Sequence, residues 1–484
     1  MKKISIIGAG LGGLTAGALL AKNGHKVTLL EQHNIVGGCA TTFNRKGGFI
    51  CEVGLHEMEG VYSNPYVKDI FEELDVYNNV TFVKPDEFFE VTTSKGSFSM
   101  PDGIDNASAA LKERFPDSKD SIDEYFNLIQ RIDREFMLLQ GASWYHYMLF
   151  PFFFPSVLKY KNKTVSEVLD GMIDNEELKL ILNINVQYYN DTPKTLSFLL
   201  HAFAQHSYFH GGGWFIKGGS QKLSDYLASV IESNGGEVIT KAMVTACENN
   251  KVTYVKRKES HSVDSDIVIS NISPEQTYDL YNLPYEQNKE IASGLLTIYI
   301  GFSKNIRATY GKRAYSNFIF DNLASMQDYE EMIQKDIEER GFVFVDYSQL
   351  DAALTKDENK SFGAICLMDY IEEWEKLDEK AYEEKKERLI ELTLEKLEQY
   401  YPNITALVEY AEVGTAKTVK RYIKTPKGTA YGYKPTPKQF FKAPKVKSSK
   451  INNLYFTGQW VISGGFSPAI LSGGLCYTEI SAKK

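Results

Sequence analysis

The sequence predicts an α/β fold with a parallel sheet, joined to a second domain of mixed α+β structure. Three observations support this fold class. The first 31 residues hold an apolar run, a glycine-rich turn and a second apolar run. A similar pairing of apolar run and glycine-rich turn returns in residues 450–484. The chain between them mixes helical and alternating patterns, and 484 residues are enough for two or three domains.

The N-terminal unit is predicted first. Lys3–Ile7 reads as a buried parallel strand, a helix follows and ends at Gly24, and His25–Leu30 is the second strand, with Glu31 directly after it. Glycines at G-x-G-x-x-G spacing allow a tight turn, backbone contact with a pyrophosphate and close helix packing; they are Gly8, Gly10 and Gly13. An acidic residue at this strand end accepts hydrogen bonds from a ribose hydroxyl and disfavours the 2′-phosphate of NADP. The unit predicts a Rossmann-type dinucleotide-binding domain rather than a signal peptide.

Composition excludes several classes of function. The net charge is −9 and no dense block of Lys or Arg occurs, so nucleic acid is not expected as a partner. The five cysteines are scattered and form no CxxC pair, which indicates neither a disulfide framework nor a zinc site, and no metal is predicted. We expect reduced thiols and a cytoplasmic protein without signal peptide or transmembrane helix.

Two motifs after the second strand separate NAD from FAD. They are NIVGGCATTF at 34–43 and GGFICEVGLHEMEG at 47–60. Here the chain resembles the FAD-dependent family of retinol saturases, carotenoid isomerases and bacterial phytoene desaturases, and the GGC-x-x-TF form is most similar to the saturase branch. Many of these relatives carry Arg where this chain has Cys39, so a cation that could face the flavin pyrophosphate is lost. The matched positions are Gly37, Gly38, Gly48, Phe49, Glu52, Gly54 and His56.

Further blocks match the same family. Gly218-Gly219 precedes a predicted helix, Leu223–Ser233, and the strands Glu237–Thr240 and Met243–Glu248. The resemblance implies that this block covers the adenine end of FAD, with the backbone near Val244 in contact.

The last block begins with a predicted strand, Leu454–Thr457, which is followed by Gly458 and Gln459 and by a helix starting near Pro468. The resemblance implies that this helix N-terminus faces the flavin C2 carbonyl, where it stabilises negative charge. Relatives often carry Asp where this chain has Gln459, and the TGQ form again favours the saturase branch.

The resemblance thus implies FAD as the cofactor and a glutathione-reductase-like form of the Rossmann-type domain, as in flavoproteins with two dinucleotide-binding folds. The predicted cofactor-binding residues are Gly8, Gly10, Leu11, Gly12, Gly13, Glu31, Gln32, Gly38, Cys39, Ala40, His56, Val244, Gly458, Gln459, Pro468, Ala469 and Ile470. Because these blocks share one cofactor, the FAD-binding domain is expected to be discontinuous. Its segments are 1–70, 206–275 and 440–484, and the substrate domain comprises 71–205 and 276–439.

The substrate domain shows four clear patterns. Thr81–Met100 alternates like paired strands with a turn at Lys95-Gly96, and Ser121–Gln140 and Glu379–Tyr401 read as helices. Phe362–Met368 looks like a central strand, although a buried helical turn has the same pattern.

Residues 144–160, WYHYMLFPFFFPSVLKY, are unusual. The apolar run is too short to span a bilayer and holds two prolines, and lysines follow at once. Three interpretations stay open: peripheral membrane contact, the roof of a hydrophobic substrate tunnel, and plain core.

The sequence contains no Ser-His-Asp order, HExxH motif or CxxC motif that would suggest another catalyst. The flavin is therefore expected to carry out the reaction by hydride transfer. His56 is the candidate proton donor or a structural hydrogen-bonding group, and Tyr431 and Tyr433 line the flavin face or simply pack. The spacing of the histidines 201, 206 and 210 is not metal geometry.

The resemblance implies an FAD-dependent oxidoreductase acting on carbon–carbon double bonds of a polyene or unsaturated lipid, with saturation favoured over desaturation. The alternatives are a flavin-dependent cis-trans isomerase and, from another class, a non-catalytic prenyl-binding chaperone like the Rab GDP-dissociation inhibitors. Glu31 and the complete C-terminal block argue against the chaperone. The electron partner stays open.

Overall fold

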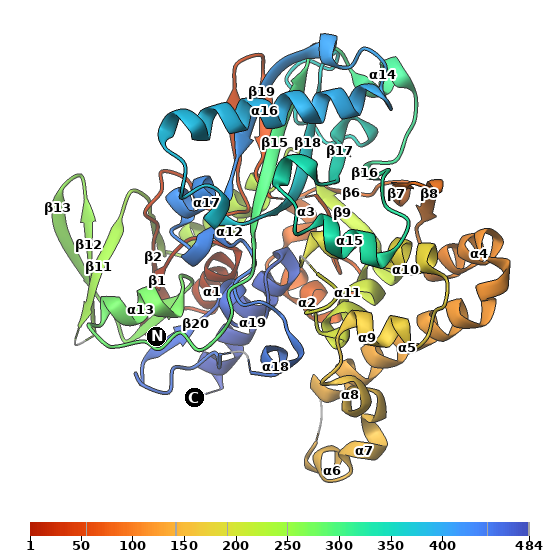
Figure 1. The fold of residues 1–484 in the computed structure, drawn as a ribbon. Coiled ribbons are helices and arrows are strands. Elements are labelled where there is room, and N and C mark those ends of the chain that lie inside the picture. The colour runs from red at the N-terminus through yellow and green to blue at the C-terminus, as the bar shows by residue number, and fades with distance from the viewer. Residues whose placement is uncertain (55, 141–142, 191, 249, 443, 483–484) are drawn as a thin grey trace.

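A computed structural model describes residues 1–54, 56–140, 143–190, 192–248, 250–442 and 444–482 (Figure 1). Its first sheet has five strands in the order β10-β2-β1-β14-β20, and every pairing in it is parallel. The strands come from three distant parts of the chain, and this sheet confirms the predicted α/β class. They are β1 Lys3–Ile7, β2 Lys26–Leu30, β10 Glu237–Ile239, β14 Ile267–Ser270 and β20 Leu454–Phe456.

Helix α1, Leu11–Lys22, is enclosed between two other helices of this sheet, α12 (Gln221–Ser233) and α19 (Phe466–Ser481). All its residues from Leu11 to Ala21 are buried, which explains why the segment is apolar on every side. The three helices approach one another closely because a glycine lies at each of the two helix contacts. A Cβ at Gly17 would lie 2.8 Å from Ile231 Cδ1, and one at Gly473 would lie 2.7 Å from the Gly12 carbonyl oxygen.

The second sheet has seven strands in the order β19-β15-β18-β17-β16-β7-β8. Its pairings are antiparallel except for β16 with β7, and α16 (Glu379–Glu398) covers one face (Figure 1). β18 is buried along its whole length, so the predicted central strand is confirmed. The strands are β7 Glu87–Thr93, β8 Gly96–Pro101, β15 Gly294–Phe302, β16 Ser316–Phe320, β17 Phe342–Asp346, β18 Ser361–Asp369 and β19 Val408–Gly414.

Three smaller sheets complete the strand structure. The first is the antiparallel meander β11–β12–β13, in the second β9 pairs with both β5 and β6, and the third is β3 with β4. The paired strands predicted within Thr81–Met100 are β7 and β8, which pair with each other. The start of that segment forms β6, which pairs with β9 instead. The bounds are β3 Thr42–Arg45, β4 Phe49–Glu52, β5 Met58–Glu59, β6 Phe82–Val83, β9 Gly213–Ile216, β11 Met243–Glu248, β12 Lys251–Lys256 and β13 Glu259–Asp264.

Residues 144–160 form three short helices that project from the body of the molecule (Figure 1). The Glu135 carboxylate accepts hydrogen bonds from the backbone of Ser156 and Val157 and thereby caps the third helix. The prolines explain why one long helix does not form. The helices are α6 Trp144–Met148, α7 Phe150–Phe153 and α8 Pro155–Tyr160.

The remaining helices surround the two large sheets, and none of the helices in the described ranges is both long and apolar enough to cross a membrane. They are α2 Pro65–Glu73, α3 Val76–Asn79, α4 Ile104–Arg114, α5 Lys119–Gln140, α9 Val165–Asp170, α10 Glu176–Asn183, α11 Phe198–Gly211, α13 Pro274–Leu280, α14 Ile306–Tyr310, α15 Met326–Met332, α17 Ala416–Ile423 and α18 Pro437–Phe440.

Candidate active site

A cavity of about 1370 Å³ joins the sequence motifs. It extends from Glu31, directly after β2 of the parallel sheet, and Val244, on β11, to Phe136 and Phe440 on α5 and α18. Its volume exceeds the few hundred to 1,000 Å³ typical of a pocket for one drug-sized ligand. The cavity therefore has room for a dinucleotide together with a second molecule.

The glycine turn lies where this cavity meets the start of α1. Gly8 has a φ of +93°, which a residue with a side chain rarely adopts. A Cβ at Gly13 would lie 2.4 Å from the Gly8 carbonyl oxygen, so the turn closes only with glycine there. A Cβ at Gly12 would lie 2.6 Å from the backbone nitrogen of Gly458. The N-terminal and C-terminal glycine motifs are therefore in direct contact.

Glu31 occupies the end of β2 and is buried, with 8% of its surface exposed. Its Oε2 accepts a hydrogen bond from the Ala9 backbone at 2.8 Å, and its Oε1 accepts one from the His33 backbone at 2.7 Å. The two bonds fix the carboxylate at the cavity wall beside the glycine turn. Each oxygen retains a further lone pair, which is what a ribose hydroxyl needs.

Asn271 was missed by the sequence reasoning. It directly follows β14, and its Oδ1 accepts a hydrogen bond from the Gly13 backbone at 3.1 Å. A Cβ at Gly10 would lie 2.6 Å from Asn271 Nδ2, and one at Gly458 would lie 2.5 Å from Asn271 Oδ1. A side chain at position 10 would therefore collide with Asn271, in addition to blocking the approach of a phosphate. A polar residue at the carboxyl end of a parallel strand was the available signal.

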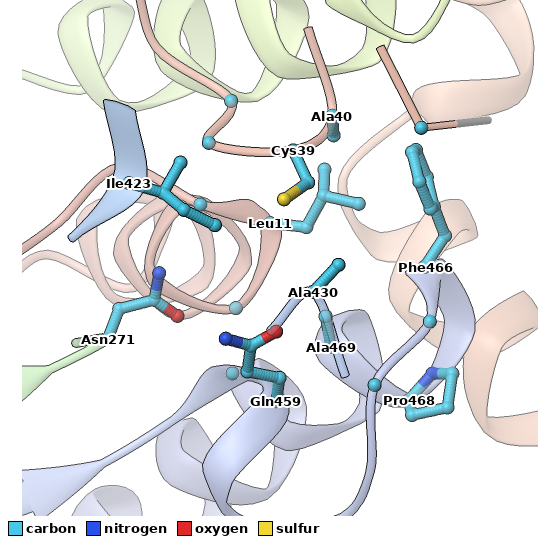
Figure 2. A pocket seen from close by; sticks show the side chains of 18 of the residues that line it. Leu11, Cys39, Ala40, Asn271, Ile423, Ala430, Gln459, Phe466, Pro468 and Ala469 are labelled. Carbon is cyan, nitrogen blue, oxygen red and sulfur yellow. The ribbon is translucent and has the colours of Figure 1, made fainter. Parts of the chain in front are cut away.

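Most of the predicted cofactor-binding residues line this one cavity, and Figure 2 shows several of them around a shared space. Two predicted residues do not line it. Gly13 lies under the turn, and Ile470 is fully buried in the core. The lining set is Gly8, Gly10, Leu11, Gly12, Glu31, Gln32, Gly38, Cys39, Ala40, His56, Val244, Gly458, Gln459, Pro468 and Ala469.

The part of the cavity wall formed by Leu11, Cys39, Ala430 and Gln459 has no charged side chain. In Figure 2, Leu11 and Cys39 face Ala430 and Gln459 across the space. Burial raises the pKa of the Cys39 thiol to about 11, so that side chain is neutral at pH 7. An anion held here would depend on helix N-termini and backbone N–H groups for its stabilisation.

The start of α19 forms the opposite wall. The helix begins at Phe466, two residues before the predicted start, and Pro468 still lies in the first turn, where no intrahelical hydrogen bond is lost. Gly465 precedes it with a φ of +112°. Phe466, Pro468 and Ala469 line the cavity (Figure 2). The positive end of this helix dipole is thus directed at the cavity.

His56 lines the cavity and is half-buried. Its Nδ1 lies 3.3 Å from the Tyr347 hydroxyl, and its Nε2 has no hydrogen-bond partner among the described residues. Its carbonyl oxygen accepts a hydrogen bond from Tyr315 at 2.8 Å. Burial lowers the pKa of His56 to about 4. The ring is therefore neutral near pH 7, which argues against its service as a proton-donating imidazolium.

The two predicted tyrosines differ in their surroundings. Tyr431 packs against Gly464, where a Cβ would lie 2.3 Å from the Tyr431 Cα. Tyr433 shares a 2.7 Å hydrogen bond with Tyr285, and its ring meets Trp460 edge-on at 5.0 Å. Both line the cavity, and burial raises the pKa of both phenols. Tyr433 is thus engaged in a hydrogen bond and in ring packing, whereas Tyr431 lies against the backbone of Gly464.

The end of the cavity away from the glycine turn is apolar. It is lined by Phe136, Leu200, Phe203 and Phe440, which sequence reasoning missed because they come from three helices far apart in the chain, α5, α11 and α18. The phenol of Tyr189 also lines it and lies 3.0 Å from His201 Nδ1.

His201 belongs to a buried hydrogen-bond network rather than to a cluster of histidines. Its Nε2 lies 3.2 Å from the Tyr125 hydroxyl. The ring of His206 stacks on His210 at 5.2 Å instead, one helical turn away on α11.

The fold and the site together define a class of protein. A parallel sheet with a glycine turn, an acidic strand end and a second helix N-terminus at one cavity is the arrangement of an FAD-dependent oxidoreductase. Residues 11–476 match the flavin containing amine oxidoreductase family, and the chain belongs to that family. FAD is accordingly its cofactor, and the lining residues fit that group.

Individual relatives have narrower names. The chain is 25% identical over 528 residues to the all-trans-retinol 13,14-reductase of Danio rerio, covering 98% of this chain and 85% of that protein. It is 24% identical over 518 residues to the 4,4'-diaponeurosporene oxygenase of Staphylococcus aureus, covering 100% and 99%. The solved cyclohexylamine oxidase from Brevibacterium oxydans has the same fold, with a TM-score of 0.64, 15% identity and coverage of 100% and 99%.

Proposed function

We propose that this FAD-dependent oxidoreductase saturates a carbon–carbon double bond of a long apolar polyene of the retinoid or carotenoid type. The observation that carries the proposal is the cavity itself, which continues from the flavin motifs into a wall of Phe136, Phe203 and Phe440. A polyene is a rod of apolar surface, and burial of such surface drives its binding. The names of the retinol and diaponeurosporene relatives support the same class of substrate.

The residues have distinct roles in this proposal. Glu31 would hold the ribose, and the N-termini of α1 and α19 would hold the pyrophosphate and the flavin carbonyl. FAD, when bound, supplies or accepts the hydride of the reaction. Gly10, Gly12 and Gly458 keep the backbone close to the cofactor, and the aromatic wall orients the substrate and excludes water.

The projecting helices α6–α8 support a second part of the proposal, which is contact with a lipid surface. Exposure is concentrated on three large side chains: Trp144 is 73% exposed, Met148 73% and Phe152 81%. Exposed lysines follow at 159, 161 and 163. Apolar and aromatic side chains beside basic ones are typical of segments that dip into a membrane interface.

The position of the projection relative to the cavity strengthens this idea. α8 packs on α5 and α11, the two helices that carry Phe136 and Phe203. The ring of Phe136 also stacks on that of Phe441 at 6.3 Å, and Phe441 is 50% exposed. The apolar end of the cavity is therefore close to the surface near the projection, and a lipid substrate would pass there from the bilayer.

The experiment that tests the function is anaerobic incubation of the photoreduced protein with all-trans-retinol and with a diapocarotenoid, followed by mass spectrometry. A gain of two hydrogen atoms supports saturation. A parallel incubation uses the oxidised protein. If the substrate loses two hydrogen atoms there, the reaction is desaturation and not saturation. A substrate of unchanged mass but altered chromatographic retention would identify isomerisation. Unchanged substrates in both redox states would contradict the proposed function.

A further inference from the structure

Two carboxyl groups at the cavity have no role in the site described so far. Glu59 ends the short strand β5 and lines the cavity, and Glu57 lies two residues earlier. Residues two apart in an extended chain point to the same side. Both acids line the cavity, and the Glu57 side chain lies against Gly213 of β9. The sequence motif GLHEMEG contains them, but its resemblance gave a role only to His56.

Glu59 is fixed beside the N-terminus of α19. Its carbonyl oxygen accepts a 2.5 Å hydrogen bond from Ser467 Oγ, and Ser467 lies in the first turn of that helix. β5 pairs with β9, Glu59 opposite Gly213, which holds the residue from the other side. Glu59 keeps some exposed surface, and as a lining residue it presents that surface to the cavity.

The surroundings disfavour ionisation of both groups. Desolvation raises the pKa of Glu59, and hydrogen bonds from its own backbone and from Ser467 offset this only in part. Desolvation also raises the pKa of Glu57 well above its usual value. Glu57 Oε2 has no hydrogen-bond partner among the described residues, and Ser316 Oγ donates to Oε1 at a distant 3.5 Å.

The charged neighbours do not reverse this preference. Lys84 attracts a Glu57 carboxylate, but Lys84 is already paired with Asp102 at 2.6 Å, and Asp102 repels the carboxylate. From the other elements, Tyr188, Tyr208 and Tyr315 face the pair with neutral phenols, because burial raises the pKa of all three.

We propose that Glu59 is the catalytic acid of the reaction, which donates its carboxyl proton to the substrate carbon next to the one that receives the hydride. This inference rests on the proposed function. It also gives His56 a positioning role, since a neutral imidazole that already contacts Tyr347 has no proton to spare at neutral pH.

The step balances in atoms and electrons. Hydride, with its two electrons, comes from the reduced cofactor and forms the first new C–H bond. The π electron pair of the double bond forms the second C–H bond with the proton of Glu59, whose O–H bond breaks. The O–H electrons stay on the carboxylate, which regains a proton from water. In the opposite direction the Glu59 carboxylate would accept the proton that leaves the substrate.

The test uses the FAD-loaded protein, Glu59→Gln, and Glu72→Gln as the matched control on the exposed side of α2. Infrared difference spectra without substrate, in H₂O and D₂O, detect the C=O stretch of a protonated carboxylic acid. We expect a band that shifts in D₂O, is present in the wild type and the control, and is lost in Glu59→Gln. Absence of this band at pH 7 would overturn the proposal.

The second readout is single turnover of the photoreduced protein with all-trans-retinol in D₂O. We expect Glu59→Gln to bind FAD fully but to react about 10²–10⁴-fold more slowly, the usual contribution of one general acid. Glu59→Asp keeps an acid on a shorter side chain and should recover part of the rate, which also covers the case in which Glu59→Gln fails to fold. A Glu59→Gln protein that reacts at the wild-type rate would refute the inference. If the wild type leaves retinol unchanged, the proposed function fails for that substrate, and the infrared band alone decides on Glu59.

Discussion

The backbone N–H of Gly13 donates a hydrogen bond to Asn271 Oδ1 at 3.1 Å, which joins two residues 258 positions apart. The same side chain lies against Gly10 and Gly458, so close that a Cβ at either position would be 2.6 Å or less from its amide atoms. Asn271 therefore connects the glycine turn, the carboxyl end of strand β14 in the parallel sheet and the C-terminal motif. We therefore expect the shape of the predicted pyrophosphate site to depend on this amide.

We predict that Asn271→Asp lowers FAD content. The carboxylate still accepts the hydrogen bond from the Gly13 backbone. It also adds a negative charge beside the expected position of the pyrophosphate, which it would repel, and it would compete with the pyrophosphate for the positive end of the helix dipole. The ratio of flavin to protein absorbance measures the effect. Asn234→Asp, at the exposed end of α12, is the matched control. Full flavin content in Asn271→Asp would show that the cofactor does not lie beside this side chain.

Glu31→Ala should release FAD without unfolding the chain. The change removes the acceptor of the Ala9 and His33 backbone bonds and the expected partner of the ribose. A hydrogen bond to a charged group contributes about 1.5–3 kcal/mol, which corresponds to an affinity loss of about tenfold or more. Fluorescence titration of the apoprotein with FAD gives the affinity, and circular dichroism checks the fold. Equal affinities for wild type and variant would refute the assignment of Glu31.

The projecting helices provide a prediction about membranes. Replacement of Trp144, Met148 and Phe152 by Ser should weaken sedimentation with liposomes at least tenfold, because each large apolar side chain contributes about 1.5–3 kcal/mol when buried. Flavin content should not change, since none of these three residues lines the cavity.

Phe154 is not a suitable target, because it is completely buried and its replacement would test the core instead. Leu283→Ser, at an exposed position outside the projection, controls for a general loss of surface hydrophobicity. Unchanged sedimentation of the folded triple variant would contradict membrane contact.

Two histidines with lowered pKa values, His56 and His201, predict acid sensitivity. Burial lowers the pKa of His56 to about 4 and that of His201 to about 3, so an unfolded chain binds more protons than the folded one below the ordinary pKa of histidine. Stability should therefore rise with pH through this range, and His56 alone should account for about 3 kcal/mol of the loss between pH 6.5 and pH 4. Urea unfolding of the wild type and of His56→Gln at both pH values isolates this contribution. Parallel losses in the two proteins would show that the folded chain does not hold His56 as a neutral ring.

The sequence alone determined the cofactor half of the molecule. Glycine spacing and a strand-terminal Glu31 act through backbone conformation, and backbone conformation is a local property that a short motif reports well. The parallel strands, helix α1 and the central strand β18 were predictable for the same reason, since each has a period or an apolar run of its own.

Only the tertiary structure decided how distant side chains meet. Asn271, Glu59 and Phe136 come to one cavity from β14, β5 and α5, and no local pattern reports such convergence. The apolar run at 144–160 shows the same limit, because Phe152 is 81% exposed whereas Phe154 is fully buried. The two residues have identical chemistry, and what separates them is packing against helices from other parts of the chain.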